Sequence, residues 1–511
     1  MEWPVTREQL RRMDPGAPRY EQIAAAFAGA ISAGRLRAGE RLPTVRRLAA
    51  DLGVGSATVS AAYNLLNLQG WTRGEVGRGT FVVGPAGGDA PAGRALPGER
   101  PAGAPRGRLS ARSATPWRRR VLYTSAARLR SAHPGALDCT SGKPDTALLP
   151  FDVVRRAWHA AVEATQPPDL QYAGPEPVES LPRALVPRLA ADNILARDAD
   201  LVVGSSAQQL MGLALAVVAA LHRRAPLVVA VEEPGYQTIY DTIERAGHRL
   251  VGVEVDEQGA IPASLDTALA AGAHAVLFTP RAHNPTGASW TVGRLAALAD
   301  VLAAHPDAIA IEDDQLADLA AARAGSLLND RRVDDRVVYI RSFAKTIAPD
   351  LRLAVAAARP RLRAALAEAK IFADGWSSRL AQRALAGVLA DGALPDALAT
   401  ARRAYAARRV AALEILTARL LPAGGAASGA DGINLWVHLP PGIDALEVIE
   451  RAAALGALVA PGEPFFIRPG RGDVVRLSVG QVDVAQAAAA AATLAEAALT
   501  TASAPSLAMS V

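Results

Sequence analysis

Apolar residues recur at two different spacings along the chain, and this difference separates a front segment from a larger body. Between residues 18 and 34 the apolar side chains recur every three or four positions, as at Ile23, Phe27 and Ile31. This helical spacing predicts one helix that ends at Gly34.

Two shorter helices and a hairpin are predicted after this first helix. Thr44 and Ser56 have side chains suited to cap two helices, and a glycine-containing turn separates them. The stretch 71–83 alternates around glycines, which is typical of a β-hairpin. Helix, helix–turn–helix and hairpin is the order of a winged helix-turn-helix, so residues 1–84 are expected to form such a domain.

Residues 85–135 show neither spacing. They are rich in Gly, Pro, Ala and Arg, and they contain 10 Arg against two acidic residues. This composition predicts a flexible basic linker. Its charge either helps to hold a polyanion or only keeps the linker solvated.

From residue 136 onwards, short apolar runs alternate with Ala/Leu-rich helical patterns. The runs expected to form buried strands are DLVVGSS, PLVVAVEEPGY, RLVGVEV, AVLFTP, AIAIEDD and RVVYIRSF. This alternation predicts a mainly parallel, doubly wound α/β domain over 136–500. The segment from INLWVHLP to VVRLSVGQV predicts a smaller α+β lobe, and residues 501–511 are expected to be disordered.

Composition narrows the class of protein. The chain has 511 residues, of which 50% are hydrophobic and 21% charged, a globular balance. Its single cysteine, Cys139, suits a reducing compartment. The N-terminus is polar and the longest apolar run, 210–221, is too short to span a bilayer. We therefore expect a cytoplasmic protein without a membrane partner, and no motif predicts a metal site.

Charge is distributed unevenly between the two ends of the chain. Residues 1–135 carry 21 Arg and nine acidic residues, a net charge of +12, whereas the remainder carries 34 basic and 41 acidic residues, a net charge of −7. A basic front suggests contact with a polyanion such as double-stranded DNA. An arginine-rich surface that is simply solvated would give the same count.

The chemistry-bearing residues of the body follow the predicted strands. In open α/β sheets ligands bind beyond the carboxyl ends of the strands. Lys345 lies there and is one of only three lysines in the chain. Asp313 could bind a pyridine nitrogen, Tyr236 could stack on a ring, and Asn284 could bond a ring oxygen. A lysine that forms a Schiff base and an acid on the ring nitrogen are what pyridoxal phosphate requires.

Other residues in this region suit the phosphate of such a cofactor. The turn Gly204-Ser205-Ser206 opens a helix, whose free N–H groups attract an anion. Ser342 and Arg352 flank Lys345 and could add a hydroxyl and a bidentate cation. Each of these features is common by itself, and a lysine beside a phosphate is often only a phosphate ligand. Their order and spacing together are more specific.

The predicted winged helix contains candidate DNA contacts. Arg46 and Arg47 begin the helix before the recognition helix and suit phosphates. Arg78, at the hairpin tip, could enter the minor groove. The small polar residues at the start of the recognition helix, which could face base edges, are Ser56, Thr58 and Ser60.

These motifs resemble two known families. Residues 136–485 resemble a fold type I aminotransferase of class I/II, through SGKPDTALLP, QYAGPEPVESLPRAL, GSSAQQL, EEPGY, HNPTG, IEDD, SFAKTIAPDLRL and VVRLSVG. Residues 18–83 resemble a GntR-type winged helix, through YEQIAAAFAGAISAGRLRAGERLPTVRRLAADLGVGSATVSAAY and GRGTFV. Joined in this order, they resemble the MocR/GabR subfamily of GntR transcription regulators.

The resemblance implies a role for each matching residue. Lys345 would form the Schiff base with pyridoxal 5'-phosphate, and Arg476 would pair with the carboxylate of an amino-acid-like effector. Tyr172 would reach the phosphate of a neighbouring subunit, which implies a homodimer. The remaining cofactor ligands would be Asp313, Asn284, Tyr236, Ser206, Ala207, Gln208, Ser342 and Arg352.

One departure from the family pattern bears on activity. The tyrosine usually found two residues after the aspartate is Gln315 here. We therefore expect a regulator that uses its aminotransferase-like domain as a sensor, with at most residual transaminase activity. The alternative is an active aminotransferase with an accessory DNA-binding domain. A further possibility is that pyridoxal phosphate itself is the signal.

Overall fold

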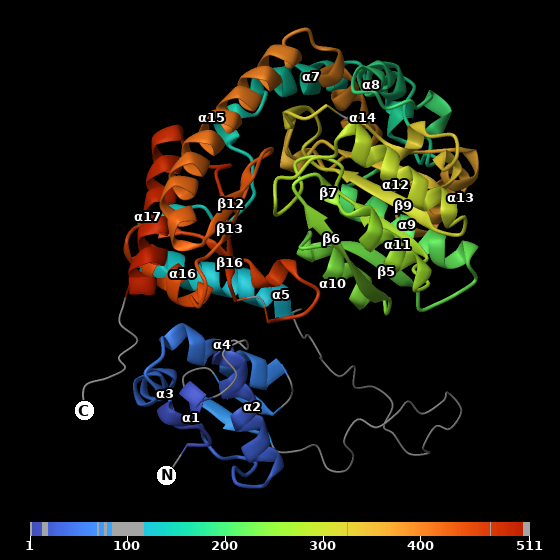
Figure 1. The fold of residues 1–511 in the computed structure, drawn as a ribbon. Coiled ribbons are helices and arrows are strands. Elements are labelled where there is room, and N and C mark those ends of the chain that lie inside the picture. Colours follow the sequence, from blue (N-terminus) through green and yellow to red (C-terminus); the bar gives the residue numbers. More distant parts are fainter. Residues whose placement is uncertain are drawn as a thin grey trace. The chain divides into compact units, whose positions relative to one another are not determined.

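The chain forms two compact units (Figure 1). The first comprises residues 1–121 with 470–472, and the second comprises the rest. The computed structural model describes residues 3–12, 19–68, 71–75, 79–83, 117–323, 325–470 and 472–503.

The first unit contains a winged helix-turn-helix, as predicted. Its elements are α1 (Arg7–Arg12), α2 (Arg19–Ser32), α3 (Val45–Leu52), α4 (Ser56–Leu68) and the hairpin β1 (Thr72–Glu75) with β2 (Gly79–Val82). The Thr44 side chain caps α3 by accepting from the Arg47 N–H, and Gly53 ends it at φ +67. Phe27 and Tyr63 meet edge to face in the core.

The predicted linker is wrong in its last part. Residues 117–132 form α5 (Trp117–Arg119), a π-helical turn (Arg120–Thr124) and α6 (Ser125–Ala132). Leu122, Ala126 and Leu129 recur at helical spacing and are buried, but the five arginines of residues 117–132 mask that period in the sequence. Residues 85–116 lie outside the described residues. At the other end of the chain, helix α17 (Val484–Ser503) extends into the predicted tail.

The body contains an eight-stranded sheet that confirms the mainly parallel, doubly wound prediction. Its order is β4-β11-β10-β9-β8-β5-β6-β7, and only β11 and β7 run antiparallel to their neighbours. The strands are β4 (Leu201–Gly204), β5 (Val228–Glu233), β6 (Arg249–Asp256), β7 (Gly259–Ala260), β8 (Ala275–Phe278), β9 (Ile309–Asp314), β10 (Val337–Ser342) and β11 (Ala354–Ala358).

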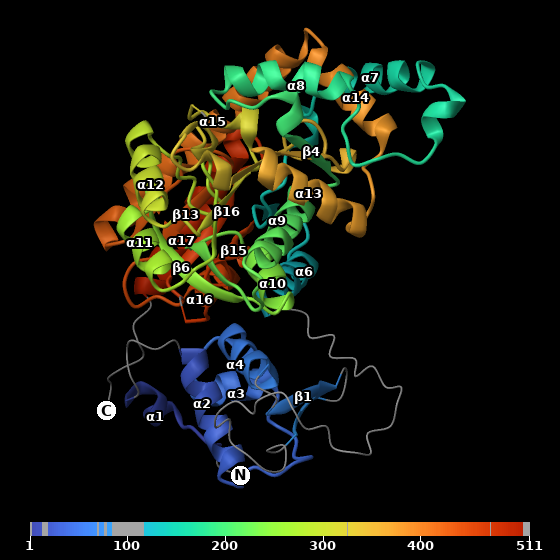
Figure 2. The same ribbon diagram turned by 90° about the vertical axis from the view of Figure 1, so that its right-hand side faces the viewer.

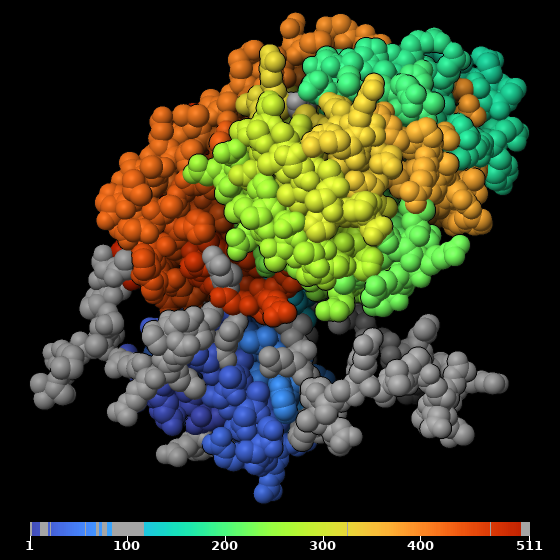
Figure 3. Space-filling model, turned by 45° about the vertical axis from the view of Figure 1, so that its right-hand side comes forward, coloured from blue at the N-terminus to red at the C-terminus, as the bar shows by residue number. Residues whose placement is uncertain are grey.

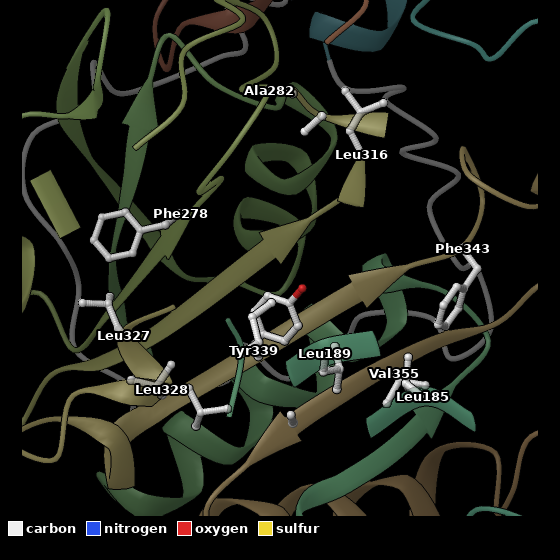
Figure 4. Close-up of a cluster of buried hydrophobic side chains, with 14 of the residues drawn as sticks. Leu185, Leu189, Phe278, Ala282, Leu316, Leu327, Leu328, Tyr339, Phe343 and Val355 are labelled. Atoms are coloured by element: carbon white, nitrogen blue, oxygen red, sulfur yellow. The ribbon is translucent and has the colours of Figure 1, made fainter. Parts of the chain in front are cut away.

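Helices cover both faces of this sheet (Figure 2). On one face lie α9 (Ala207–Leu221), α10 (Gln237–Arg245) and α13 (Pro360–Ala373), and on the other lie α11 (Pro262–Ala270) and α12 (Val292–Ala304). Alternate strand residues supply the two cores, so that Ile340 belongs to the first and Tyr339 to the second. Figure 4 shows the second core, where Tyr339 and Phe278 lie with Leu327 and Leu328.

A smaller lobe adjoins the sheet domain, as its orange and red surface in Figure 3 shows. It contains a four-stranded antiparallel sheet, β12 (Ala426–Ser428), β13 (Asn434–His438), β16 (Val474–Ser478) and β15 (Ala460–Pro461). A parallel pair, β3 (Leu137–Asp138) and β14 (Ala457–Leu458), lies in the same lobe.

Helices α15 (Leu394–Leu420), α16 (Ala445–Ala454) and α17 pack on the lobe, and α15 lies along α17. Helices α7 (Phe151–Glu163), α8 (Ser180–Ala191) and α14 (Arg379–Ala390) pack together at the other end of α15. Among the described residues no single helix has the length and apolar composition to cross a membrane, although the bent pair Arg379–Ala390 and Leu394–Ala423 reaches that threshold jointly.

One aspartate fastens the lobe to the sheet domain. Asp431 Oδ1 accepts from the Ala321 N–H at 2.7 Å, and Oδ2 accepts from the Ala322 N–H at 2.9 Å and from Ser289 Oγ at 3.1 Å. Ser289 in turn accepts from the Ala282 N–H at 2.8 Å. The lobe is therefore attached directly to the 282–289 loop.

Candidate cofactor, effector and DNA-binding sites

The candidate cofactor site lies at the carboxyl ends of the central strands. Strands β9 and β10 are parallel, with Ile340 opposite Asp313. The segments that follow them therefore leave the sheet at the same edge. Asp313 is the penultimate residue of β9, and Lys345 follows β10 by three residues. The neighbouring strands β5 and β8 lead into Tyr236 and Asn284 at this edge.

Asp313 is buried with an unsatisfied oxygen. It helps to line a small pocket between the sheet, α9 and α10, together with Tyr236 and Met211. Asp313 Oδ1 has no hydrogen-bond partner among the described residues. Burial raises the pKa of Asp313 to about 7, although the nearby Lys345 ammonium draws it down. A buried carboxylate with a free oxygen suits a ligand that supplies a proton or a positive charge.

Lys345 is held by an amide and lies near two charges. Its Nζ donates to Gln315 Oε1 at 2.7 Å. Burial lowers the pKa of Lys345 to about 8; Asp313 opposes this shift and Arg476 adds to it. A pKa near neutrality gives this lysine a substantial neutral fraction, which a nucleophilic amine needs.

Arg476 reaches the same site from strand β16 of the smaller lobe. Its Nη1 donates to Asn284 Oδ1 at 3.0 Å and its Nη2 donates to the Thr140 carbonyl at 2.7 Å. The guanidinium lies over the Phe465 ring, 4.7 Å from its centroid. Nε is buried and has no partner among the described residues. Burial lowers the pKa of Arg476 to about 10, against the influence of Tyr123 and Tyr236.

Asn284 connects the two halves of the site. Its Oδ1 accepts from Arg476 and from Asn434 Nδ2, the latter at 3.4 Å. With the oxygen used in this way, the amide nitrogen remains as a donor toward a ring oxygen.

The predicted phosphate ligands lie side by side through the strand register. Ala354 of β11 is opposite Ser342 of β10 on one side and opposite Gly204 of β4 on the other. Arg352 precedes Ala354 by two residues and is exposed. The strand register therefore brings these residues to one edge of the sheet.

Ser206 begins α9 and uses its side chain as the helix cap. It accepts from the Gln209 N–H at 3.1 Å, which leaves the N–H groups of Ala207 and Gln208 in the first turn. These groups are available to bind an anion at the helix N-terminus.

Tyr172 lies at the surface of the second unit. Its side chain is 90% exposed, and its ring meets Trp376 edge to face at 5.5 Å between centroids.

The candidate DNA contacts differ in their exposure. Arg46 and Arg47 are exposed on α3, Ser56 is exposed at the start of α4, and Ser60 is half-buried. Thr58 is fully buried, so its predicted contact with DNA is wrong. It lies one turn before Ala62, which belongs to the buried side of α4. Arg78 lies outside the described residues.

Three neighbours of the site escaped sequence analysis: the Thr140 carbonyl and the Phe465 ring, which contact Arg476, and Asn434, which donates to Asn284. Asn434 lies on the same face of the small sheet as Arg476, because Trp436 is opposite Arg476 and Asn434 is two residues before it. Pairing of INLWVH with VVRLS would have indicated this, but register is not readable from either strand alone.

The site residues fit pyridoxal phosphate. A flat pyridine ring suits the free oxygen of Asp313, the pocket wall at Tyr236 and the donor on Asn284. A phosphate suits the N-terminus of α9. Among the described residues, no group of three or more His, Cys, Asp or Glu side chains is arranged to hold a metal ion.

Comparison with known proteins gives two family matches. Residues 140–494 match aminotransferase class I and II, and residues 19–82 match the gntR family of bacterial regulatory proteins. The chain is 32% identical over 450 residues to the vitamin B6 salvage pathway transcriptional repressor PtsJ of Salmonella typhimurium, covering 88% of this chain and 91% of the relative. It is 29% identical to the regulator TauR of Rhodobacter capsulatus, with coverages of 85% and 87%.

The body also resembles solved structures. A multiple substrate aminotransferase from Thermococcus profundus superposes with a TM-score of 0.66 at 21% identity, covering 75% of this chain and 95% of that one. This likeness establishes the aminotransferase fold.

Proposed function

The chain belongs to the MocR-type regulators, which join a gntR-family winged helix to an aminotransferase class I and II domain, and from this premise we propose that its body senses an amino compound that carries a carboxylate. The carrying observation is that Lys345, Asp313 and Arg476 converge on one site in a chain that also carries a winged helix.

Pyridoxal phosphate, when bound, supplies an aldehyde that combines with amines and a pyridine ring that withdraws electrons. We assign Lys345 as the amine that holds it, and Asp313 as the carboxylate that keeps a proton on the ring nitrogen. Tyr236, which lines the same pocket as Asp313, would cover one face of the ring, and the Asn284 amide nitrogen would donate to its oxygen. The first turn of α9, Ser342 and Arg352 would hold the phosphate.

Arg476 is the anchor for the effector carboxylate. A guanidinium forms two parallel hydrogen bonds with a carboxylate, and Nε of Arg476 is a buried donor still lacking a partner among the described residues. Only two of the five N–H donors of Arg476 are used in the bonds to Asn284 and the Thr140 carbonyl. The bond to Asn284 is the one that joins the lobe to the sheet domain, so an effector that replaced it would alter the contact between them.

Gln315 supports a sensor more than a rapid catalyst. Its amide accepts from Lys345 at 2.7 Å, but an amide does not exchange protons at neutral pH as a phenol or carboxylate can. Proton transfer at this site then depends on Lys345 and water, and the effector would remain bound without efficient turnover.

A second candidate signal is pyridoxal phosphate itself. The relative PtsJ is described as a repressor of a vitamin B6 salvage pathway. The cofactor ligands of this chain would suffice for such a role, without Arg476.

We also propose a cytoplasmic homodimer that binds double-stranded DNA through Arg46, Arg47, Ser56, Ser60 and Arg78. Tyr172 and Phe372 are 90% and 84% exposed, which is unusual for large apolar side chains and suits a surface covered by a second copy.

The test combines cofactor absorbance with binding to promoter DNA. With pyridoxal phosphate bound, an amino acid effector should change both the absorbance and the DNA affinity of the natural protein. Arg476→Ala should keep the cofactor and lose both responses, whereas Arg403→Ala, at an exposed arginine of α15, should keep them.

An Arg476→Ala variant that responds normally would remove this arginine from the effector site. If pyridoxal phosphate alone changes DNA affinity and no amino acid adds to it, the cofactor is the signal. A natural protein that binds no pyridoxal phosphate would overturn the proposal as a whole.

A further inference from the structure

We propose that Lys370, Asp374 and Gln209 form a relay that positions the phosphate-binding turn at the start of α9. The proposal rests on the proposed function, because the phosphate is that of the assigned cofactor. It assigns a purpose to Lys370, which is fully buried at the end of α13.

The relay is a continuous chain of hydrogen bonds between two helices. Lys370 Nζ donates to Asp374 Oδ1 at 2.7 Å. The other oxygen of this carboxylate, Oδ2, accepts from Gln209 Nε2 at 2.7 Å. Gln209 Oε1 then accepts from the Ser205 N–H at 2.7 Å and from Ser205 Oγ at 3.0 Å.

The bond from Asp374 to Gln209 distinguishes this relay from a local ion pair. Lys370 and Asp374 are four residues apart, a spacing at which such pairs form routinely. The second carboxylate oxygen, however, contacts another helix and orients its Gln209 amide. Because the amide donates on one side, its oxygen must face Ser205 on the other.

The relay determines which hydrogen-bond donors of the turn remain available to the phosphate. Both polar hydrogens of Ser205 are directed to Gln209, so Ser205 is withdrawn from the phosphate. The N–H groups of Ala207 and Gln208 are left for the anion. The turn is also tight: a Cβ at Gly204 would lie 2.6 Å from Leu210 Cγ and 3.1 Å from Gln209 Oε1.

The ammonium of Lys370 fixes the carboxylate in place. A buried ammonium needs a charged or strongly polar partner, and Asp374 supplies it. The side chain of Asp374 is 32% exposed, so without Lys370 water would compete for it and the orientation of Gln209 would be lost. These three residues are positioning residues, because none of them is assigned to touch the cofactor.

The experiment compares pyridoxal phosphate with pyridoxal, which lacks the phosphate, in the full-length protein. Asp374→Asn keeps the size of the side chain and removes its charge, and Lys370→Met removes the ammonium. Both should weaken pyridoxal phosphate roughly tenfold, the loss expected for one charge-assisted hydrogen bond. Pyridoxal should bind these variants as it binds the natural protein.

The matched control is Arg359→Met, which removes ion pairs to Asp200 and Asp334 at the other end of α13. This variant should alter the stability of the protein without changing the ratio of its affinities for pyridoxal phosphate and pyridoxal. The double variant Gln209→Glu with Asp374→Asn exchanges donor and acceptor along the relay and should recover most of the lost affinity.

Equal weakening of both ligands in Asp374→Asn, or no weakening of either, would overturn the relay. Failure of the double variant to improve on Asp374→Asn would also count against it. If the natural protein binds neither ligand, the cofactor assignment fails instead, so the two failures are distinguishable.

Discussion

Asp313 and Asp314 are adjacent residues with opposite electrostatic environments. Asp313 lies on the α9 face of the sheet with one free oxygen. Asp314 points to the other face, where Arg281 donates to both of its oxygens, at 2.9 Å and 2.8 Å. Burial would raise the pKa of Asp314, but Arg281 and Arg341 hold it below its usual range. Strand alternation thus assigns ligand binding to one acid and structural pairing to the other.

The pKa of Lys345 gives a pH dependence for cofactor capture. Only the neutral amine attacks an aldehyde. With the pKa at about 8, the capture rate should rise about tenfold per pH unit below that value and level off above it. Stopped-flow absorbance after mixing with pyridoxal phosphate measures this profile.

Asp313→Asn should move the profile to lower pH, because Asp313 raises the pKa of Lys345. Asp307→Asn, at an exposed residue before the other end of β9, should leave the profile unchanged. A shift to higher pH in Asp313→Asn would contradict the charge interaction between Asp313 and Lys345.

At the scale of elements, buried residues of the winged helix stabilise it, and exposed residues are available to bind DNA. Thr58 is buried and Arg46 is exposed. Thr58→Ala should therefore speed amide hydrogen exchange in α2, α3 and α4, at a cost of about 1–2 kcal/mol. It should not change which DNA sequence is preferred.

Arg46→Ala should weaken binding to all DNA sequences about equally and reduce the slope of log affinity against log salt by about 1. Arg155→Ala, at an exposed arginine of α7, is the control and should leave the slope unchanged. An Arg46→Ala variant that alters sequence preference would make this residue a base contact.

Elements with a clear period were predictable, and elements defined by distant pairing were not. The parallel strands appear as apolar runs, so the sheet edge that carries Asp313 and Lys345 could be expected from the sequence. The contact of Arg476 with Asn284 joins residues 192 positions apart. The register of β13 with β16 places Asn434 on the same face of the small sheet as Arg476. Helix 117–132 was missed because arginines interrupt its apolar positions.

At the scale of the whole molecule, the proposed homodimer would make Tyr172 a link between assembly and cofactor binding. The exposed Phe372 and the contact between Tyr172 and Trp376 bring large apolar side chains to the surface from two segments. Phe372→Ser should weaken the dimer at least tenfold, a change of about 1.4 kcal/mol. Sedimentation at several protein concentrations measures it.

Tyr172→Phe should leave the dimer intact and weaken pyridoxal phosphate, since only the hydroxyl is lost. Val292→Ser, at another strongly exposed apolar residue, controls for loss of surface hydrophobicity. A natural protein that remains monomeric with its cofactor bound would contradict the proposed role of Tyr172.

Helix α15 is the longest helix packed on the smaller lobe, and it moves as one rigid element. Its 27 residues span about 40 Å, and it lies along α17. The lobe is fastened near Ser289 through Asp431, and Arg476 lies within the same lobe. A tilt of about five degrees about that attachment would move a point about 40 Å away by about 3.5 Å. A change at the bond between Arg476 and Asn284 that tilted the lobe by this angle would therefore displace the far end of α15 by slightly more than the length of a hydrogen bond.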